Sequence, residues 1–229
     1  TSNLLVDLFD MLVRNETYDN ILNKVEEVLD NSNNIKQTVI NLIILTFQTR
    51  DCRGGKGEKQ LFYNLLYILY KKYPEVVLEV IEYVHIYGYF QDYWNFLCFY
   101  KEAESSSEKE WRKIDKLYEK IIDIYATQLK NDKKELELSI SKNKIPNLSF
   151  AGKWAPREKK SIDRKLKVVK KLTHKLGYKD ISEYRKLIVK LNQVLKTTEV
   201  KMSSRKWSEI EFQNVTSKCL HLHLNSFLN

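Results

Sequence analysis

The chain has 229 residues and a formal net charge of +9, and it contains only six glycines and three prolines. So few helix-breaking residues favour long helices with short connections, and they argue against a β-sandwich or β-barrel, which needs a turn every 8–12 residues or so. A hydrophobic share of 43% excludes wholesale disorder, and no apolar run approaches the roughly 18 residues that would cross a bilayer.

Hydrophobic periodicity predicts helices along most of the chain, because apolar residues recur at intervals of three and four. Pro74 and Gly88 fit the first position and the end of one helix. The predicted helices cover about residues 3–14, 18–29, 34–50, 58–73, 74–87, 89–103, 111–130, 132–142, 159–176 and 181–195.

A segment rich in breakers interrupts this pattern. Residues 143–158 hold two prolines and one glycine within 11 residues, which indicates irregular backbone. We predict an all-α, HEAT-like helical-repeat arc (an α-solenoid) of about ten helices. It forms a single domain, residues 1–229, in which N-terminal helices (1–142), the irregular connection (143–158) and basic C-terminal helices (159–229) follow one another.

Positive charge is concentrated in one part of the chain. Residues 151–206 contain 18 Lys or Arg against 5 Asp or Glu, whereas the other residues contain 21 against 25. Such an asymmetry is typical of a surface that binds a polyanion, and a solvated helix face is the alternative.

The segment 159–176 has the clearest basic pattern. Its apolar residues recur at helical spacing and predict one face on the core. The opposite face carries five cations that repel one another, with few acidic residues nearby to reduce the repulsion. This pattern favours binding to a phosphate backbone, and a plain solvated face is the alternative. These cations are Lys160, Arg164, Lys167, Lys171 and Lys175.

The stretch RDCRGGKGEK, residues 50–59, places three of the six glycines beside four cations. Glycine permits close approach of a ligand, and the next helix would offer free N–H groups, so an anion site built on Arg50, Arg53 and Lys56 is one interpretation. The other is a tight turn between helices in which Arg53 donates to backbone carbonyls. The sequence does not match a Walker loop.

Aromatic residues give a weaker signal. The run at residues 87–100 offers platforms for stacking bases, but its helical spacing favours a core between helices. Trp154 is flanked by Lys153 and Arg157 in the predicted irregular segment. It either stacks on a base or fills a gap between helix layers.

Catalysis has little support in the sequence. Cys219, His221 and His223 form a C-L-H-L-H run, but in a helix the two histidines point about 200° apart, and no second ligand pair is present. No familiar nucleophile motif occurs. We therefore predict neither an enzyme nor a metal or other cofactor, and no membrane partner. The sparse, odd cysteine count fits a reducing compartment and predicts a cytoplasmic location.

Several segments together resemble a known family. They are RDCRGGKGEKQLFY, IYGYFQDYWNFL, AGKWAPRE with the basic segment after it, and YRKLIVKLNQVLKTTEVKMSSRKWSEIEF. The family comprises largely uncharacterised proteins of plants, fungi, protists and giant DNA viruses. In these a TROVE-like helical module is joined to a von Willebrand A domain, a layout similar to that of the Ro autoantigen.

The matching motifs are specific as a set. The family's R-G-G-K-G-E-R corresponds to residues 53–59, its K-W-A-P to residues 153–156, and its R-x-W-x-x-I to Arg205, Trp207 and Ile210. The resemblance implies a HEAT-like ring or arc that binds structured or damaged RNA through a basic surface. No D-x-S-x-S motif of a von Willebrand A metal site is present. The chain is therefore expected to be the helical part alone, in a truncated form or with a second chain that supplies the other domain.

These observations predict a non-catalytic RNA-binding protein of a ribonucleoprotein, in which a basic helix face contacts phosphates. The alternative is a protein-interaction scaffold subunit in a larger complex with an acidic partner protein. The Asn, Ile, Lys and Tyr bias suits an AT-rich genome, so a giant virus is the expected source, with host cytoplasm or virion as the location. The predicted nucleic-acid-binding residues are Arg50, Arg53, Lys56, Lys153, Trp154, Arg157, Lys160, Arg164, Lys167, Lys171 and Lys175.

Overall fold

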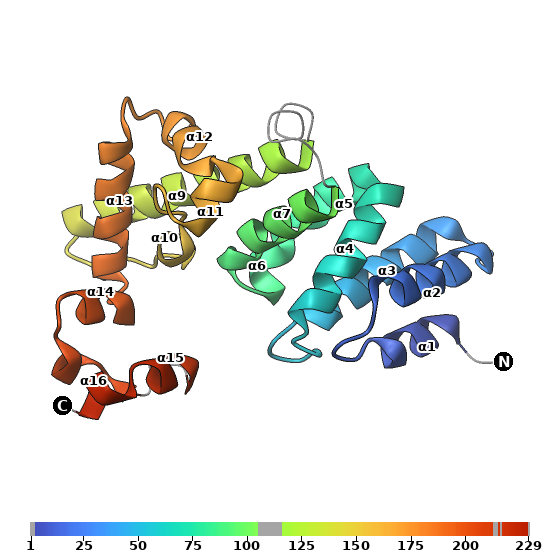
Figure 1. Ribbon diagram of the computed structural model, residues 1–229. Coiled ribbons are helices and arrows are strands. Elements are labelled where there is room, and N and C mark those ends of the chain that lie inside the picture. Colours follow the sequence, from blue (N-terminus) through green and yellow to red (C-terminus); the bar gives the residue numbers. More distant parts are fainter. Residues whose placement is uncertain (1–2, 105–115, 213–214, 216, 229) are drawn as a thin grey trace. The chain divides into compact units, whose positions relative to one another are not determined.

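The computed structural model describes residues 3–104, 116–212, 215 and 217–228. Every regular element in these ranges is a helix, and none is a strand, which confirms the predicted all-α class. The chain divides into two compact units: Thr1–Ile124 with Arg164–Leu166 form unit 1, and Tyr125–Asp163 with Lys167–Asn229 form unit 2 (Figure 1). The arrangement of the helices as a HEAT-like solenoid and the single domain stay predictions.

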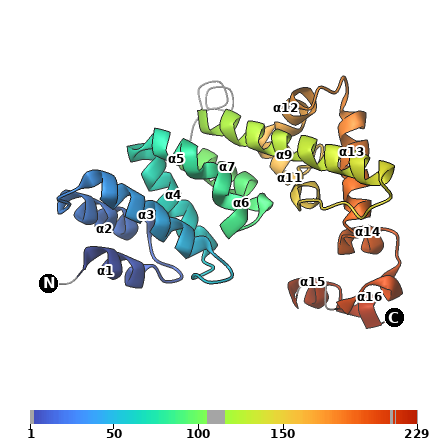
Figure 2. The same ribbon diagram turned by 180° about the vertical axis from the view of Figure 1, so that it is seen from behind.

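Side-chain caps begin three of the first four helices of unit 1. The four helices are α1 (Leu4–Met11), α2 (Tyr18–Asp30), α3 (Ile35–Arg50) and α4 (Lys59–Lys72). Asn3, Thr17 and Asn34 precede α1, α2 and α3, and each side chain accepts a backbone N–H of the first turn. α3 packs along α4, and α2 contacts both, as the two opposite views show (Figures 1 and 2).

The predicted helix 74–87 consists of three consecutive pieces. α5 (Pro74–Val80) is followed by the 3₁₀ turn η1 (Ile81–Tyr83) and by α6 (Val84–Tyr87), which ends at Gly88. α7 (Phe90–Glu104) then packs on α6 and α4. Tyr93, Trp94 and Phe96 of α7 are fully buried, so the helical part of the aromatic run is core, as its spacing favours, whereas Tyr87 and Tyr89 before it are exposed.

α9 (Lys116–Ser141) is one helix where the sequence predicted two, at 111–130 and 132–142. Residues 111–115 lie outside the described ranges. Asp132, where the second predicted helix began, is buried, and its carboxylate accepts the hydroxyl of Ser149 at 2.7 Å and the side-chain amide of Gln128 at 3.0 Å. A satisfied buried carboxylate does not interrupt a helix, so the helix continues.

Unit 2 is built on the later part of α9, together with α10 (Ala151–Trp154), α12 (Val168–Lys175) and α13 (Ile181–Val194). α10 lies inside the segment predicted to be irregular. The buried side chains of Tyr125, Tyr184 and Asn192 donate to carbonyl groups in and just after α10, at 2.7, 2.7 and 2.8 Å. Polar anchoring of this kind fixes a segment that has few backbone hydrogen bonds of its own.

α10 also packs very closely on α13. A Cβ on Gly152 would lie 2.8 Å from the Cβ of Leu191, so only glycine permits this approach. The remaining elements are short: α14 (Thr198–Ser203), the 3₁₀ turn η2 (Trp207–Glu209), α15 (Ser217–Leu222) and α16 (Leu224–Leu228). Of the helices in the described part of the chain, none combines the length and apolar character needed to span a membrane.

Candidate nucleic-acid interface

The segment 159–176 forms two helices, so the prediction of one continuous helix is wrong. α11 (Ser161–Leu166) ends at Lys167, whose φ of 55° is left-handed, and α12 begins at the next residue. Leu166 and Val168 are both fully buried, yet residues two apart in one helix point about 200° from each other. The break allows both to be buried, at a cost of about 1–2 kcal/mol for the left-handed residue.

Side chains of both units support this break. In unit 2 the Asp163 carboxylate accepts the backbone N–H of Val169 at 3.0 Å, and thereby satisfies a donor in the first turn of α12. In unit 1 the buried hydroxyl of Tyr118 donates to the carbonyl of Leu166 at 2.9 Å. A single basic face from Lys160 to Lys175 is therefore not formed, because the left-handed residue interrupts the regular progression of 100° per residue.

The break changes which cations α12 presents. Its buried residues, centred on Leu172, place Lys170 and His174 on the exposed side, whereas Lys171 and Lys175 are half-buried. The sequence pattern placed Lys171 and Lys175 on one basic face with the other three cations because it treated Lys167 as ordinary helix. The other three predicted cations, Lys160, Arg164 and Lys167, are exposed.

A hollow of about 560 Å³ lies between α12 and the start of α13. Lys170 and His174 reach it from α12, Lys179 from the connection, and Arg185 from α13. We call it the α12–α13 hollow. Two lysines, one arginine and one histidine from three consecutive elements thus meet around one concave surface, and an excess of positive charge in a concave surface favours an anion.

Two carboxylates also line the hollow, and both have partners in the protein. Asp180 caps α13 by accepting the N–H of Ser182 at 2.6 Å, and its hydrogen bonds to Ser182 lower the pKa of its carboxyl group. Glu158 lies 3.8 Å from both Lys159 and Arg185. The acids therefore serve local structure and offset the positive charge only in part.

Tyr178 adds an aromatic wall to the hollow. Its ring is half-buried, and the Lys133 ammonium lies 5.0 Å from the ring centroid. The hydrogen bond between Lys133 and Tyr178 raises the pKa of Lys133. A cation over one ring face is a favourable arrangement, and it adds positive charge to this edge of unit 2.

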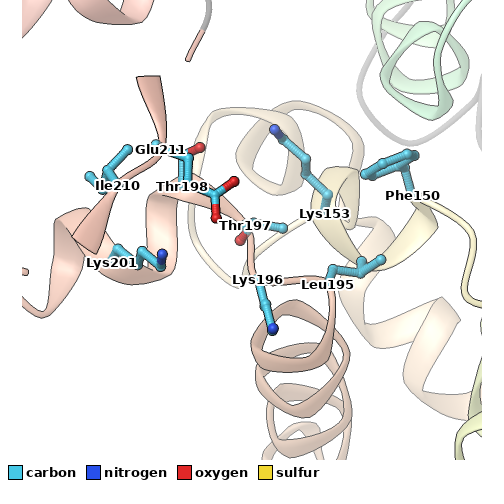
Figure 3. Close-up of a pocket in the computed structure, with 9 residues that line it drawn as sticks. All are labelled: Phe150, Lys153, Leu195, Lys196, Thr197, Thr198, Lys201, Ile210 and Glu211. Carbon is cyan, nitrogen blue, oxygen red and sulfur yellow. The ribbon is translucent and has the colours of Figure 1, made fainter. Parts of the chain in front are cut away.

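Lys153 and Trp154 lie in α10, not in irregular backbone as predicted. Trp154 is half-buried, with the Lys153 ammonium 5.3 Å from the centroid of its ring. Lys153 also lies 3.4 Å from Glu199 and lines a cavity of about 450 Å³ with Lys196 and others (Figure 3). Arg157 is exposed at the edge of a smaller depression of about 210 Å³.

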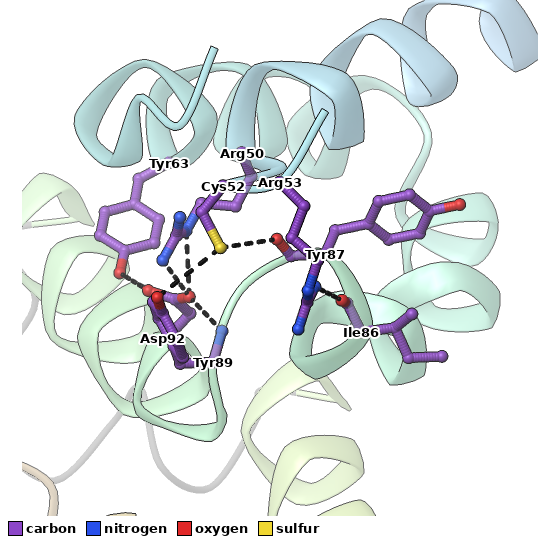
Figure 4. A network of polar contacts seen from close by, with 8 residues as sticks. All are labelled: Arg50, Cys52, Arg53, Tyr63, Ile86, Tyr87, Tyr89 and Asp92. Carbon is purple, nitrogen blue, oxygen red and sulfur yellow. Dashed lines mark hydrogen bonds and ion pairs between the residues drawn. The ribbon is translucent and has the colours of Figure 1, made fainter. Parts of the chain in front are cut away.

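The glycine-rich stretch between α3 and α4 holds unit 1 together (Figure 4). The guanidinium of Arg50, 5% exposed, lies 2.8 Å from the carboxylate of Asp92, which is 2% exposed. The same carboxylate accepts the hydroxyl of Tyr63 at 2.7 Å and the N–H of Tyr89 at 2.8 Å. Arg50 is therefore a buried structural residue, and its prediction as a phosphate contact is wrong.

Arg53 and Lys56 bind backbone carbonyls at the ends of neighbouring helices. Arg53, which is exposed, donates to the carbonyl of Ile86 at 2.8 Å, as the tight-turn interpretation expected (Figure 4). Lys56 is half-buried and donates to the carbonyls of Phe9 and Leu12 at the end of α1. Each cation thus complements the negative end of a helix, so the two are not gathered around one anion site.

Steric contacts and backbone conformation explain why this stretch contains glycines. A Cβ on Gly55 would overlap the carbonyl oxygen of Gln48, and Gly57 has a φ of 69°, which side chains other than glycine disfavour. A Cβ on Gly54 would meet only an ordinary contact with Asp51. Two of the three glycines are therefore required by the structure of the turn itself, Gly55 by packing and Gly57 by its backbone conformation.

The exposed cations that the sequence interpretation missed are Lys170, Lys179 and Arg185 around the hollow. Lys170 and His174 are spaced by four residues, which is the signal that places them on one side of a helix. The spacing can be interpreted in this way only when α12 is known to begin at Val168. Two lysines of the second cavity are not indicated by any periodicity, because Lys196 lies in the turn after α13 and Lys201 in the short α14.

The fold and these surfaces define an all-α protein whose positive charge is concentrated in a stretch that lies largely in unit 2. The chain belongs to the family described as "Domain of unknown function (DUF2828)", whose model matches residues 105–229. It is also similar to "Uncharacterized protein L728" of Acanthamoeba polyphaga mimivirus, with 23% identity over 229 residues that cover 97% of this chain. The chain spans 38% of the length of that relative. No solved structure matches the chain.

Proposed function

We propose that the chain binds RNA through the exposed cations of unit 2, with the α12–α13 hollow as the centre of the contact. The observation that carries the proposal is the convergence of Lys170, His174, Lys179 and Arg185 on one concave surface. The two lysines and the arginine would neutralise phosphate groups and release the counterions that otherwise surround the nucleic acid. The Tyr178 ring beside them suits stacking against a base.

The proposed role is binding without catalysis, because the lysines and the arginine of the hollow suit the holding of phosphate groups. Phosphate contacts carry no base identity, so we expect recognition of strand form more than of sequence. The proposal places the protein in a ribonucleoprotein of the cytoplasm, or of a virion if its source is viral.

Two further points support this function. The resemblance to the TROVE-like helical module, carried by residues 53–59 and 153–156, implies an RNA-binding, HEAT-like arc. Both motifs make contacts inside their own unit, through Arg53 and Lys56 in one and through the Pro156 carbonyl in the other. Exposed basic side chains, among them Lys170, Lys179 and Arg185, lie on α12, α13 and their connection. The relative in a giant virus agrees with the range of organisms that the resemblance implies.

The test is fluorescence anisotropy with labelled single-stranded RNA, an RNA hairpin and duplex DNA. The double variant Lys170→Glu/Lys179→Glu removes two cations of the hollow and should weaken RNA binding at least tenfold. Lys36→Glu/Lys59→Glu is the matched control, because it makes the same change in net charge on exposed residues of unit 1. Lys36 and Lys59 lie in the first turns of α3 and α4, where glutamate favours the helix dipole.

Equal losses in the two variants would show a response to net charge and would contradict a site at the hollow. Weak binding of all three nucleic acids by the wild type would contradict the proposal itself. A scaffold function would then take its place. In that case an apolar groove of about 280 Å³ between α1 and α3, where Val6 and Ile44 are half-exposed, would be the surface to test for a protein partner.

A further inference from the structure

A second concave surface of unit 2 has a different chemistry from the α12–α13 hollow. The cavity of about 450 Å³ is enclosed by α10, the end of α13, α14 and the residues that follow η2. Its volume falls within the roughly 300–1,000 Å³ of small-molecule sites. Figure 3 shows Phe150 and Lys153 on one side, with Lys201 and Glu211 on the other.

The charged groups of the cavity favour an anion. Three lysines, Lys153, Lys196 and Lys201, line it against one carboxylate, that of Glu211. Lys196 is exposed and has a left-handed φ of 49°. It lies two residues after the end of α13, and its backbone N–H donates to the carbonyl of Gln193 in that helix at 3.2 Å.

Two of the lysines have partners that an anion could supplement or replace. The ion pair of Lys153 with Glu199 is 3.4 Å long, and the Glu199 side chain is 55% exposed. Partly exposed pairs of this kind contribute little stability, so Lys153 can turn to a ligand at low cost. Lys201 donates to the carbonyl of Glu209, which leaves the two other hydrogens of its ammonium group for an acceptor in the cavity.

An exposed aromatic ring completes the cavity. Phe150 is 58% exposed although it is large and apolar, and it lies beside Lys153 (Figure 3). A flat apolar ring next to ammonium groups presents the two features that a nucleotide needs, a stacking surface for the base and cations for the phosphate. Inorganic phosphate alone would leave the ring unused, and an apolar ligand would leave the lysines unpaired.

We infer that this cavity binds one nucleoside monophosphate unit, with the base on Phe150 and the phosphate held by Lys153 and Lys196. This unit can be an unpaired nucleotide of a bound RNA, and in that case the inference rests on the proposed function. A free nucleotide is the other source, and the chemistry of the site is the same for both.

Isothermal titration calorimetry of the full chain with uridine monophosphate, uridine and inorganic phosphate tests the inference. The wild type should bind the nucleotide at least tenfold more tightly than either part alone. Phe150→Ala should weaken nucleotide binding about tenfold, in line with the contribution of one stacked base. Lys196→Asn, which suits a left-handed backbone, should do the same. The controls are Phe212→Ala and Lys190→Gln, which change an exposed ring and an exposed cation of unit 2 outside the cavity.

Nucleotide binding no tighter than that of phosphate, or unchanged in Phe150→Ala and Lys196→Asn, would overturn the inference. Anisotropy with single-stranded RNA separates this failure from that of the proposed function. If RNA still binds while the nucleotide does not, the cavity is not the site and the proposed function stands. If the wild type binds neither, both are overturned. A loss of RNA affinity in Phe150→Ala would identify the ligand of the cavity as a nucleotide of the bound RNA. A loss confined to the binding of uridine monophosphate would identify it as a free nucleotide.

Discussion

The buried ion pair between Arg50 and Asp92 gives a prediction with a large expected effect. Asp92→Asn keeps the size of the side chain but removes the charge that compensates Arg50, whose own side chain is only 5% exposed. The Asp92 oxygen that accepts from Arg50 at 2.8 and 3.0 Å also accepts the N–H of Tyr89. An asparagine would place an amide N–H₂ group or a single oxygen among these donors, so at least one donor loses its acceptor.

Removing one partner of a buried pair costs about 3–5 kcal/mol, because the remaining charge stays buried and uncompensated. Since whole domains have stabilities of about 5–15 kcal/mol, Asp92→Asn should remove a large fraction of the stability of unit 1. Urea denaturation followed by circular dichroism measures the loss. Amide hydrogen exchange in α4 and α7 shows whether it falls in unit 1.

The matched control is Glu75→Gln, which breaks the ion pair of Glu75 with Lys116, 2.8 Å long but with both side chains 72% exposed. Pairs as exposed as this contribute at most about 1 kcal/mol. A loss for Asp92→Asn as small as that for Glu75→Gln would refute the argument that the glycine-rich stretch is held by a buried charge.

Gly55→Ala is expected to lower the urea midpoint far more than Gly54→Ala, since only the first Cβ would overlap a backbone oxygen, and equal midpoints would contradict this packing argument. Burial lowers the pKa of His85, so the folded state binds a proton less readily than the unfolded state, in which the pKa is about 6.5. The stability should therefore fall as the pH drops below about 6.5. The fall should be smaller in His85→Gln, when urea midpoints are compared above and below that pH. Burial also raises the pKa of the Cys98 thiol, so a thiol reagent at about pH 8 should modify exposed Cys52 first, and peptide mapping that finds equal rates would refute this.

Much of the fold follows from local sequence signals. The bounds of α2, α3, α4 and α13 lie within one or two residues of the predicted ones, because cap residues such as Thr17 and Asp180 coincide with the start of an apolar repeat. The errors arose where distant residues decide the local structure. Helix α9 continues through Asp132 because the hydroxyl of Ser149 donates a hydrogen bond to its buried carboxylate. Neither residue predicts this contact from the local sequence.

The same limit applies to the candidate site. The concentration of charge between residues 151 and 206 was visible in the sequence, but the faces it occupies depend on the left-handed Lys167. That conformation follows from the burial of both Leu166 and Val168, which is a tertiary fact. Arg50 shows the opposite error, since a cation beside glycines indicated a ligand site until its partner, Asp92, 42 positions away, was known.

The salt dependence of RNA affinity tests the central claim most directly. Labelled single-stranded RNA is titrated with the wild type and with Lys170→Glu/Lys179→Glu between about 50 and 300 mM salt. Each contact with a phosphate of single-stranded RNA contributes about 0.7 to the slope of log affinity against log salt, so the three cations of the hollow predict a wild-type slope of about −2. The variant should have a slope shallower by about 1.4. A wild-type slope near zero, or the same steep slope in both proteins, would contradict RNA binding at the α12–α13 hollow.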